Sequence, residues 1–190
     1  KVSKSTVNRY PAVVRSILLW ARDEWEWIDK APKVKLFREP PGRERSITVE
    51  QAEALLCELP AHQRDVVLFT LATGLRQSNV LRLEWSHVNL ESGHAWVDAD
   101  QSKNRRPIAV PLNLKALEVL RRQSGKHPAR VFTYAGRPLD RANTHAWQKA
   151  LKRAGIENFR WHDLRHTWAT WHRQSGTPTH ELQRLGGWRT

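Results

Sequence analysis

Methionine is absent from this chain of 190 residues, and cysteine occurs once, as Cys57. Because position 1 is not a methionine either, we expect the chain to be a piece of a longer protein. A single cysteine excludes an internal disulfide framework and suits a reducing cytoplasm. Cys57 ends the apolar segment 54–57, so we expect it to be a small buried side chain rather than a nucleophile.

Long apolar runs are also missing. No segment approaches the roughly 18 consecutive apolar residues that cross a bilayer, and no secretory signal peptide is visible. A membrane partner is therefore not expected. The chain also lacks a glycine-rich phosphate loop and a cluster of acidic residues, which are the usual sequence signs of nucleotide binding and of metal binding. We predict neither a cofactor nor a metal site.

Positive charge is abundant. The 32 lysine and arginine residues exceed the 19 acidic residues, so the formal net charge is +13 and the isoelectric point is about 10.7. These basic residues occur in every segment instead of forming a tail, which is typical of a folded surface that faces a polyanion. The alternative, an ordinary basic protein without such a partner, stays open on charge alone.

Two parts of the chain differ in their pattern. Residues 5–28 show helical spacing of apolar side chains, and we expect this wide stripe to pack against partners outside the sequence. Residues 31–45 contain three prolines and mixed charge, so they are predicted to be a linker. The predicted organisation is therefore a helix from one domain in 1–30, a linker in 31–45 and a second domain in 46–190.

The second domain is predicted to be mainly helical, with a small antiparallel sheet of about three strands, an α+β fold. Thr48 and Gln51 resemble a capping box, and Gly74 is a plausible left-handed helix end. Period-two apolar patterns indicate strands at 88–90, 95–97 and 108–110. Helical patterns occur at 48–59, 62–73, 77–85, 113–122, 141–154, 164–174 and 179–185.

Two arginine motifs lie far apart in the sequence. Thr-Gly-Leu-Arg ends at Arg76, His-Asp-Leu-Arg-His contains His162 and Arg165, and Lys103 lies between them in a basic turn. Each guanidinium offers a planar fork of donors for phosphate oxygens, while lysine and histidine can move protons to and from ester oxygens. This set of side chains predicts a phosphoryl-transfer site, without a metal, on a nucleic-acid backbone.

Each residue also has a simpler interpretation. Arg76 can be a surface arginine and Lys103 a solvated turn lysine, and a structural role for His166 is as good as a catalytic one. His162 and His166 have the spacing of two metal ligands, but Arg165 on the same helical face repels a cation. The joint occurrence of these motifs, in this order, favours the phosphate site.

The ordered motifs resemble the tyrosine recombinases, the phage integrase family. The resemblance covers most of 46–190 and rests on Ala-Thr-Gly-Leu-Arg at 72–76, the turn with Lys103 before Ile-Ala-Val-Pro-Leu at 108–112, His-Asp-Leu-Arg-His-Thr at 162–167, and Leu-Gly-Gly-Trp at 185–188. By this resemblance, residues 1–30 form the C-terminal helix of a core-binding domain, which binds DNA. Residues 46–190 form a catalytic domain.

The resemblance also implies roles for individual residues. Arg76 and Arg165 would hold the scissile phosphate, Lys103 would protonate the leaving 5′-oxygen, and His162 would assist proton transfer. Trp188 takes a place that histidine or tryptophan fills in relatives, next to the nucleophile. Arg105 and Arg106 are predicted to contact DNA. Asn79 is a departure, since relatives often carry an acidic residue there.

The family's nucleophile is a tyrosine shortly after the position of Trp188. Tyr10 and Tyr134 are the two tyrosines of the chain, and both precede the motifs that the nucleophile should follow. We therefore expect the nucleophile beyond Thr190, and expect this piece to be inactive without it.

The implied activity is site-specific cleavage and rejoining of double-stranded DNA through a 3′-phosphotyrosyl intermediate, for integration or excision of a mobile element. The implied setting is the bacterial cytoplasm, with a tetramer of the full-length protein on DNA. Two alternatives stay open: a DNA-binding module of the same fold without catalysis, and an enzyme that only relaxes DNA, as type IB topoisomerases do.

Overall fold

The computed structural model describes residues 2–40, 44–100 and 107–188. The chain divides into two compact units, Lys1–Arg43 and Glu44–Thr190. Lys103, Arg105 and Arg106, three of the predicted site residues, lie outside the described residues. None of the described helices is both long enough and apolar enough to cross a membrane.

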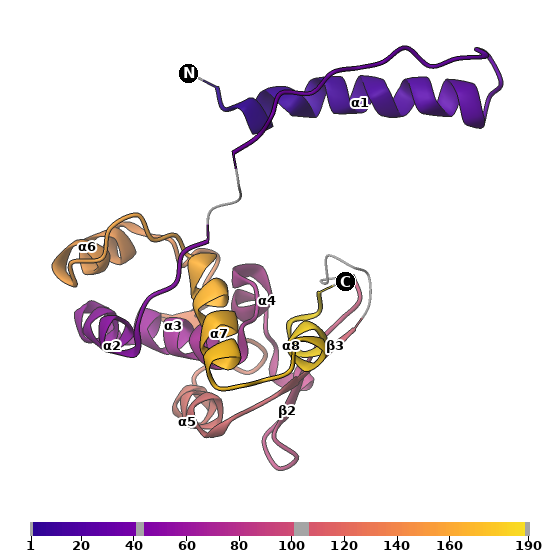
Figure 1. Ribbon diagram of the computed structural model, residues 1–190. Coiled ribbons are helices and arrows are strands. Elements are labelled where there is room, and N and C mark those ends of the chain that lie inside the picture. Colours follow the sequence, from indigo (N-terminus) through magenta and orange to yellow (C-terminus); the bar gives the residue numbers. More distant parts are fainter. Residues whose placement is uncertain (1, 41–43, 101–106, 189–190) are drawn as a thin grey trace. The chain divides into compact units, whose positions relative to one another are not determined.

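The first unit is one helix with a returning segment. Helix α1 spans Lys4–Asp23, so it ends five residues before the predicted end at 28. The chain then runs back along the helix (Figure 1). The buried Asn8 holds this return, because its Oδ1 accepts from the Phe37 N–H at 2.8 Å and its Nδ2 donates to the Phe37 carbonyl at 2.8 Å. The predicted apolar stripe, with Val13 and Trp20, remains exposed among the described residues.

The second unit is built around α3, which spans Ala61–Thr73. Its buried residues lie on every side of the helix, as expected for a helix that runs through a core. Helix α5 (Leu114–Gln123) and helix α7 (Asp163–Gln174) pack against it, and α2 (Val49–Glu58) packs against α6 (His145–Arg153). The remaining described helices are α4 (Gln77–Leu81), the short 3-10 helix η1 (Trp85–His87) and α8 (Thr179–Gly186).

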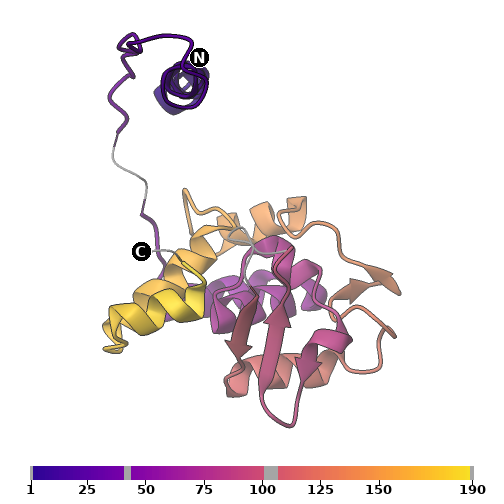
Figure 2. The same ribbon diagram turned by 90° about the vertical axis from the view of Figure 1, so that its right-hand side faces the viewer.

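A small sheet covers one side of these helices (Figure 2). Its antiparallel strands β1 (Val88–Asn89), β2 (His94–Val97) and β3 (Ile108–Pro111) lie in the order β1-β2-β3. The register pairs Ala95 with Val110, and burial alternates along β2 and β3 as a half-buried sheet requires. The predicted fold class, mainly helical with about three antiparallel strands, is confirmed.

Several local predictions differ from the structure. The hairpin of β4 (Thr133–Tyr134) and β5 (Arg137–Pro138) was not predicted, because strands of two residues carry no measurable period. Helix α4 ends at Leu81 rather than 85, since the next residues pair with 129–131: the Val131 N–H donates to the Leu83 carbonyl at 3.0 Å. Helix α6 begins at residue 145 rather than 141.

The prediction for Cys57 is wrong, because its side chain is exposed. Helix α2 buries Ala52 and Leu55, and the buried Leu59 follows directly after the helix, at spacings of three and four residues. Position 57 lies on the opposite side of the helical wheel from these residues and therefore faces solvent. The capping box at the start of α2 is confirmed, with the Thr48 hydroxyl accepting from the Gln51 N–H at 3.2 Å.

Candidate nucleic-acid-cleavage site

The first arginine motif forms the turn between α3 and α4. Gly74 ends α3 with φ +66°, a left-handed conformation that few other residues adopt, and its N–H donates to the Thr70 carbonyl at 2.8 Å. The buried Leu75 anchors the turn in the core. Arg76 then stands at the start of α4, and its Nη1 is buried without a hydrogen-bond partner among the described residues.

The second motif places Arg165 on the first turn of α7, with its side chain only 3% exposed. Its Nη1 donates to the carbonyl of Gly74 at 2.5 Å, and its Nη2 donates to the carbonyl of Gly186 at the end of α8. The two arginine motifs are therefore in direct contact. A guanidinium carries five N–H groups, so these two bonds leave donors for another acceptor.

Two tryptophans fix the surroundings of Arg165. The ring of Trp188 lies 4.5 Å from the Arg165 Cζ, within cation–π range. Trp168 packs against Trp188 with ring centroids 5.8 Å apart, and it also lies under the turn at Gly74. A Cβ atom on Gly74 would stand 2.3 Å from the Trp168 ring, so this approach of backbone to ring requires glycine.

The site concentrates positive charge away from water. Burial, together with the charge of Arg76, lowers the pKa of Arg165 to about 10, so Arg165 still keeps its charge at neutral pH. Within the part of the chain that the structure describes, no carboxylate forms an ion pair with either arginine. The buried Arg165 next to the half-buried Arg76 is costly unless an anion compensates the two charges, so the arrangement suits a phosphate.

His162 stands at the entrance to α7, next to these arginines. Loss of hydration lowers the pKa of His162, and the charges of His166, Arg165 and Arg76 lower it further, whereas Asp163 raises it. The rings of His162 and His166 meet edge to face, with centroids 5.1 Å apart. A neutral imidazole at pH 7 can accept a proton, which is the function expected of a base beside a reacting phosphate.

The structure thus brings Arg76, His162, Arg165 and Trp188 together, and the role of each in a reaction stays a prediction. No group of three potential metal ligands occurs among residues 2–40, 44–100 and 107–188. Asn79 is buried, and its Oδ1 accepts from the Ser78 hydroxyl at 3.4 Å rather than from Arg76.

Sequence reasoning missed the contact between Trp168 and the turn at Gly74. It also missed the carbonyl of Gly186. The paired glycines before Trp188 were the available signal, since glycine permits a close approach of backbone to other groups.

Comparison with known proteins places this arrangement in a family. Residues 45–190 match the model of the phage integrase family. The integrase of Salmonella phage P22 is 41% identical over 97% of this chain and 51% of its own length. The shufflon-specific DNA recombinase of Escherichia coli is 30% identical over 87% of this chain and 43% of its own length. The chain spans about half the length of these curated relatives.

Solved structures show the same fold. An integrase of the Tn1549 transposon, in complex with a circular intermediate DNA, matches 98% of this chain and 72% of its own with a TM-score of 0.79 and 17% identity. A lambda integrase dimer bound to a COC′ core site matches 98% of this chain and 73% of its own with a TM-score of 0.72 and 18% identity. With the family model covering 45–190, this chain belongs to the phage integrase family, the tyrosine recombinases.

Proposed function

We propose that this chain carries the phosphate-binding part of a site-specific recombinase, which cleaves and rejoins double-stranded DNA during integration or excision of a mobile element. One observation carries the proposal: two arginines share a site with no carboxylate ion pair among the described residues, and one buried Nη1 lacks a partner. The relatives named as integrases and as a recombinase support it.

The proposed chemistry is a transfer of one phosphodiester to a tyrosine and back. The tyrosyl oxygen attacks phosphorus and loses its proton, the P–O5′ bond breaks, and Lys103 gives a proton to the leaving 5′-oxygen. A 5′-hydroxyl later reverses these steps. Arg76 and Arg165 donate to the non-bridging oxygens, and His162 takes part in proton transfer. Because one ester replaces another, no ATP is needed.

Neither tyrosine of the chain is a good nucleophile for this site. Tyr134 stacks on His62 with ring centroids 4.2 Å apart, at the first turn of α3. Gly74 lies at the other end of that helix, about 18 Å away at 1.5 Å per residue. Tyr10 belongs to the other unit. The proposal therefore places the nucleophile after Thr190 in the longer protein.

Assembly belongs to the same proposal. A lambda integrase tetramer bound to a Holliday junction is among the structures similar to this chain, with a TM-score of 0.72. We extend the proposal to a tetramer of the full-length protein on double-stranded DNA in the bacterial cytoplasm, with Arg105 and Arg106 contacting the DNA. Strand exchange in such a complex, rather than relaxation alone, separates a recombinase from a type IB topoisomerase.

A nicked suicide substrate tests the proposal, because the nick releases the 5′ end and traps a covalent adduct. The 190-residue chain, the protein extended through its natural continuation, and an extended Arg165→Ala variant are compared. The extended protein should form the adduct, and Arg165→Ala should form it about 10²–10³-fold more slowly, as expected when one preorganised donor is lost.

The matched control is an extended Arg121→Ala variant, since Arg121 is an exposed arginine of α5. It should react at the rate of the unmodified extended protein. Covalent trapping by the 190-residue chain would refute the hypothesis that the nucleophile is a tyrosine after Thr190. No trapping by the extended protein would favour a DNA-binding module without catalysis.

A further inference from the structure

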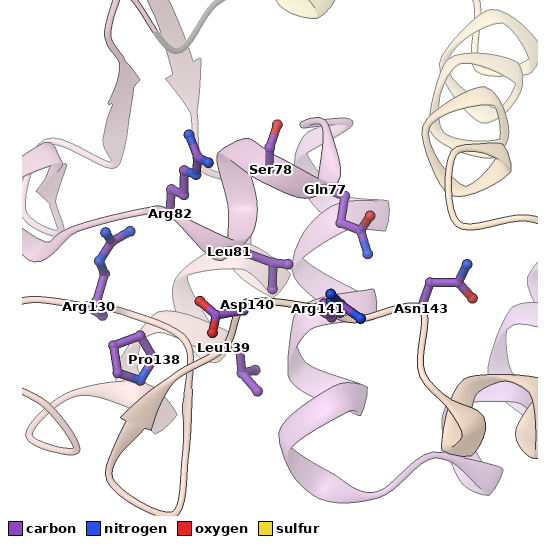
Figure 3. A pocket seen from close by; sticks show the side chains of 10 residues that line it. All are labelled: Gln77, Ser78, Leu81, Arg82, Arg130, Pro138, Leu139, Asp140, Arg141 and Asn143. Atoms are coloured by element: carbon purple, nitrogen blue, oxygen red, sulfur yellow. The ribbon is translucent and has the colours of Figure 1, made fainter.

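A polar cavity lies beside α4, and neither arginine of the two motifs lines it. It has a volume of about 550 Å³. We call it the α4 pocket. Figure 3 shows its polar side chains around a floor formed by Leu81 and Leu139. The polar lining includes Gln77, Arg82, Arg130, Asp140, Arg141 and Asn143.

The wall that carries Arg130 is held by backbone pairing. Residues 83–85 pair with 129–131, where the Trp85 N–H donates to the Ala129 carbonyl at 2.8 Å. The Leu139 N–H donates to the Phe132 carbonyl at 3.2 Å, which closes the hairpin at the floor. Arg130 itself lies 3.6 Å from Glu84. The side chains on this wall therefore project from a fixed backbone.

The opposite wall, residues 140–144, is held by two glutamines. Gln63 is buried, and its Nε2 donates to the Ala142 carbonyl at 3.2 Å and to the Thr144 hydroxyl at 2.5 Å. The Gln77 carbonyl, in the amide orientation that satisfies its neighbours, accepts from the N–H groups of Asn143 at 3.2 Å and Ala142 at 3.3 Å. The α4 pocket is thus preformed, and its occupant need not order these loops.

Charge identifies the kind of occupant. The side chains of Arg82 and Arg141 are exposed and form no hydrogen bond or ion pair within the described part of the chain. Arg130 is shared with Glu84, and Asp140 is the one carboxylate that lines the pocket. With Arg130 paired to Glu84, the guanidinium groups of Arg82 and Arg141 face the single lining carboxylate of Asp140. This excess of positive charge favours an anion, and the planar forks match the oxygens of a phosphate.

The α4 pocket is adjacent in sequence to the proposed phosphate site. Its lining begins at Gln77, the residue directly after Arg76. A DNA strand whose scissile phosphate is held by Arg76 and Arg165 carries further phosphates on both sides, so its backbone passes close to α4. We propose that the α4 pocket binds a second backbone phosphate of the same duplex and so sets the register of the strand. Phosphate contacts have this positioning effect in protein–DNA complexes.

This inference rests on the proposed function, and its test separates the two. The 190-residue chain is compared with an Arg82→Gln, Arg141→Gln double variant. The matched control is a Lys115→Gln, Arg121→Gln double variant, which removes the same charge from exposed positions on α5. Binding to two duplexes of unrelated sequence is measured at several salt concentrations. Melting followed by circular dichroism verifies that all three proteins are folded.

The lost phosphate contact should reduce the slope of log K against log salt by about 0.9, equally for both duplexes, whereas the control should keep the original slope. Asp140→Asn should tighten binding to both duplexes, because it removes a carboxylate that repels phosphate.

An unchanged slope in the pocket variant, with normal binding by the original chain, would contradict phosphate binding in the α4 pocket but leave the proposed function intact. A loss confined to one sequence would show base-edge readout and would also contradict phosphate binding in the pocket. Failure of the original chain to bind either duplex would overturn the proposed function as well.

Discussion

Gly74 is the residue on which the contact between the two arginine motifs depends. Its φ of +66° and the Trp168 ring at 2.3 Å from a built Cβ both oppose any other residue. Gly74→Ala should therefore lower the free energy of unfolding by about 2–5 kcal/mol, from backbone strain and from overpacking together. Urea unfolding followed by circular dichroism measures this loss.

Gly125→Ala provides the matched control. Gly125 has φ +79°, but nothing lies within 4 Å of a built Cβ, so only the backbone term applies, about 1–2 kcal/mol. Equal losses in the two variants would contradict a structural role for the contact between Trp168 and the turn.

His162 should link DNA binding to pH. In the free protein its pKa is lowered by lost hydration and by neighbouring cations, so it is neutral at pH 7. A bound phosphate favours the imidazolium and raises this pKa, so binding takes up a proton. Duplex affinity should increase as pH falls from 8 to 6, as measured by fluorescence anisotropy at constant salt.

His162→Gln should reduce this increase, while His180→Gln, at an exposed position of α8, should leave it unchanged. A pH response of the same size in His162→Gln would assign the proton to another group. The free energy of folding responds to pH in the opposite direction. Since the folded pKa is the lower one, the unfolded chain takes up the proton first as pH falls below about 6.5, and His162 then disfavours folding.

At the scale of elements, α2 depends on its cap. The Thr48 hydroxyl accepts from the Gln51 N–H, and the Gln51 side chain accepts from the Thr48 N–H at 3.1 Å. Thr48→Ala removes one of these bonds and should cost about 1 kcal/mol of unfolding free energy in thermal or urea denaturation.

Thr179→Ala is the control for the cap, because Thr179 is exposed at the start of α8 and its hydroxyl forms no hydrogen bond with any described residue. Its effect should stay within about 0.5 kcal/mol. A cost for Thr179→Ala as large as that for Thr48→Ala would contradict the capping account.

Elements with local signals were predicted well, and those set by distant partners were not. The cap of α2 and the left-handed end of α3 are encoded within four residues, so they are readable from the sequence. Helix α4 stops at Leu81 because the following residues pair with 129–131, a segment nearly 50 residues away. Residues 141–144 stay outside α6 and are held by Gln63, again from a distance.

At the scale of the whole molecule, the second unit should fold alone. Every residue of the main hydrophobic core lies in it, from Ile47 to Leu164. Ile47 also joins its start to α7, since its N–H donates to the Thr167 hydroxyl at 3.2 Å and its carbonyl accepts from the Trp171 Nε1 at 3.1 Å. A chain of residues 44–190 should melt cooperatively at the temperature of the 190-residue chain.

A chain of residues 50–190, which also lacks Ile47 and Thr48, is the contrasting case. It loses a buried side chain, the bonds to α7 and the cap of α2, so it should melt at a clearly lower temperature. A large drop already in the chain of 44–190 would show that the first unit stabilises the second.

The sequence by itself determined the family of this protein and predicted its chemistry. The types and order of Arg76, His162, Arg165 and Trp188 indicated a phosphate site and the family, because a motif is a local pattern that survives without coordinates. The tertiary structure decided which hydrogen-bond partners each of these side chains has. Arg165 donates to carbonyls 91 and 21 residues away, whereas the buried Nη1 of Arg76 has no partner among the described residues. Such contacts depend on how α3, α7 and α8 pack, and no short-range pattern records that packing.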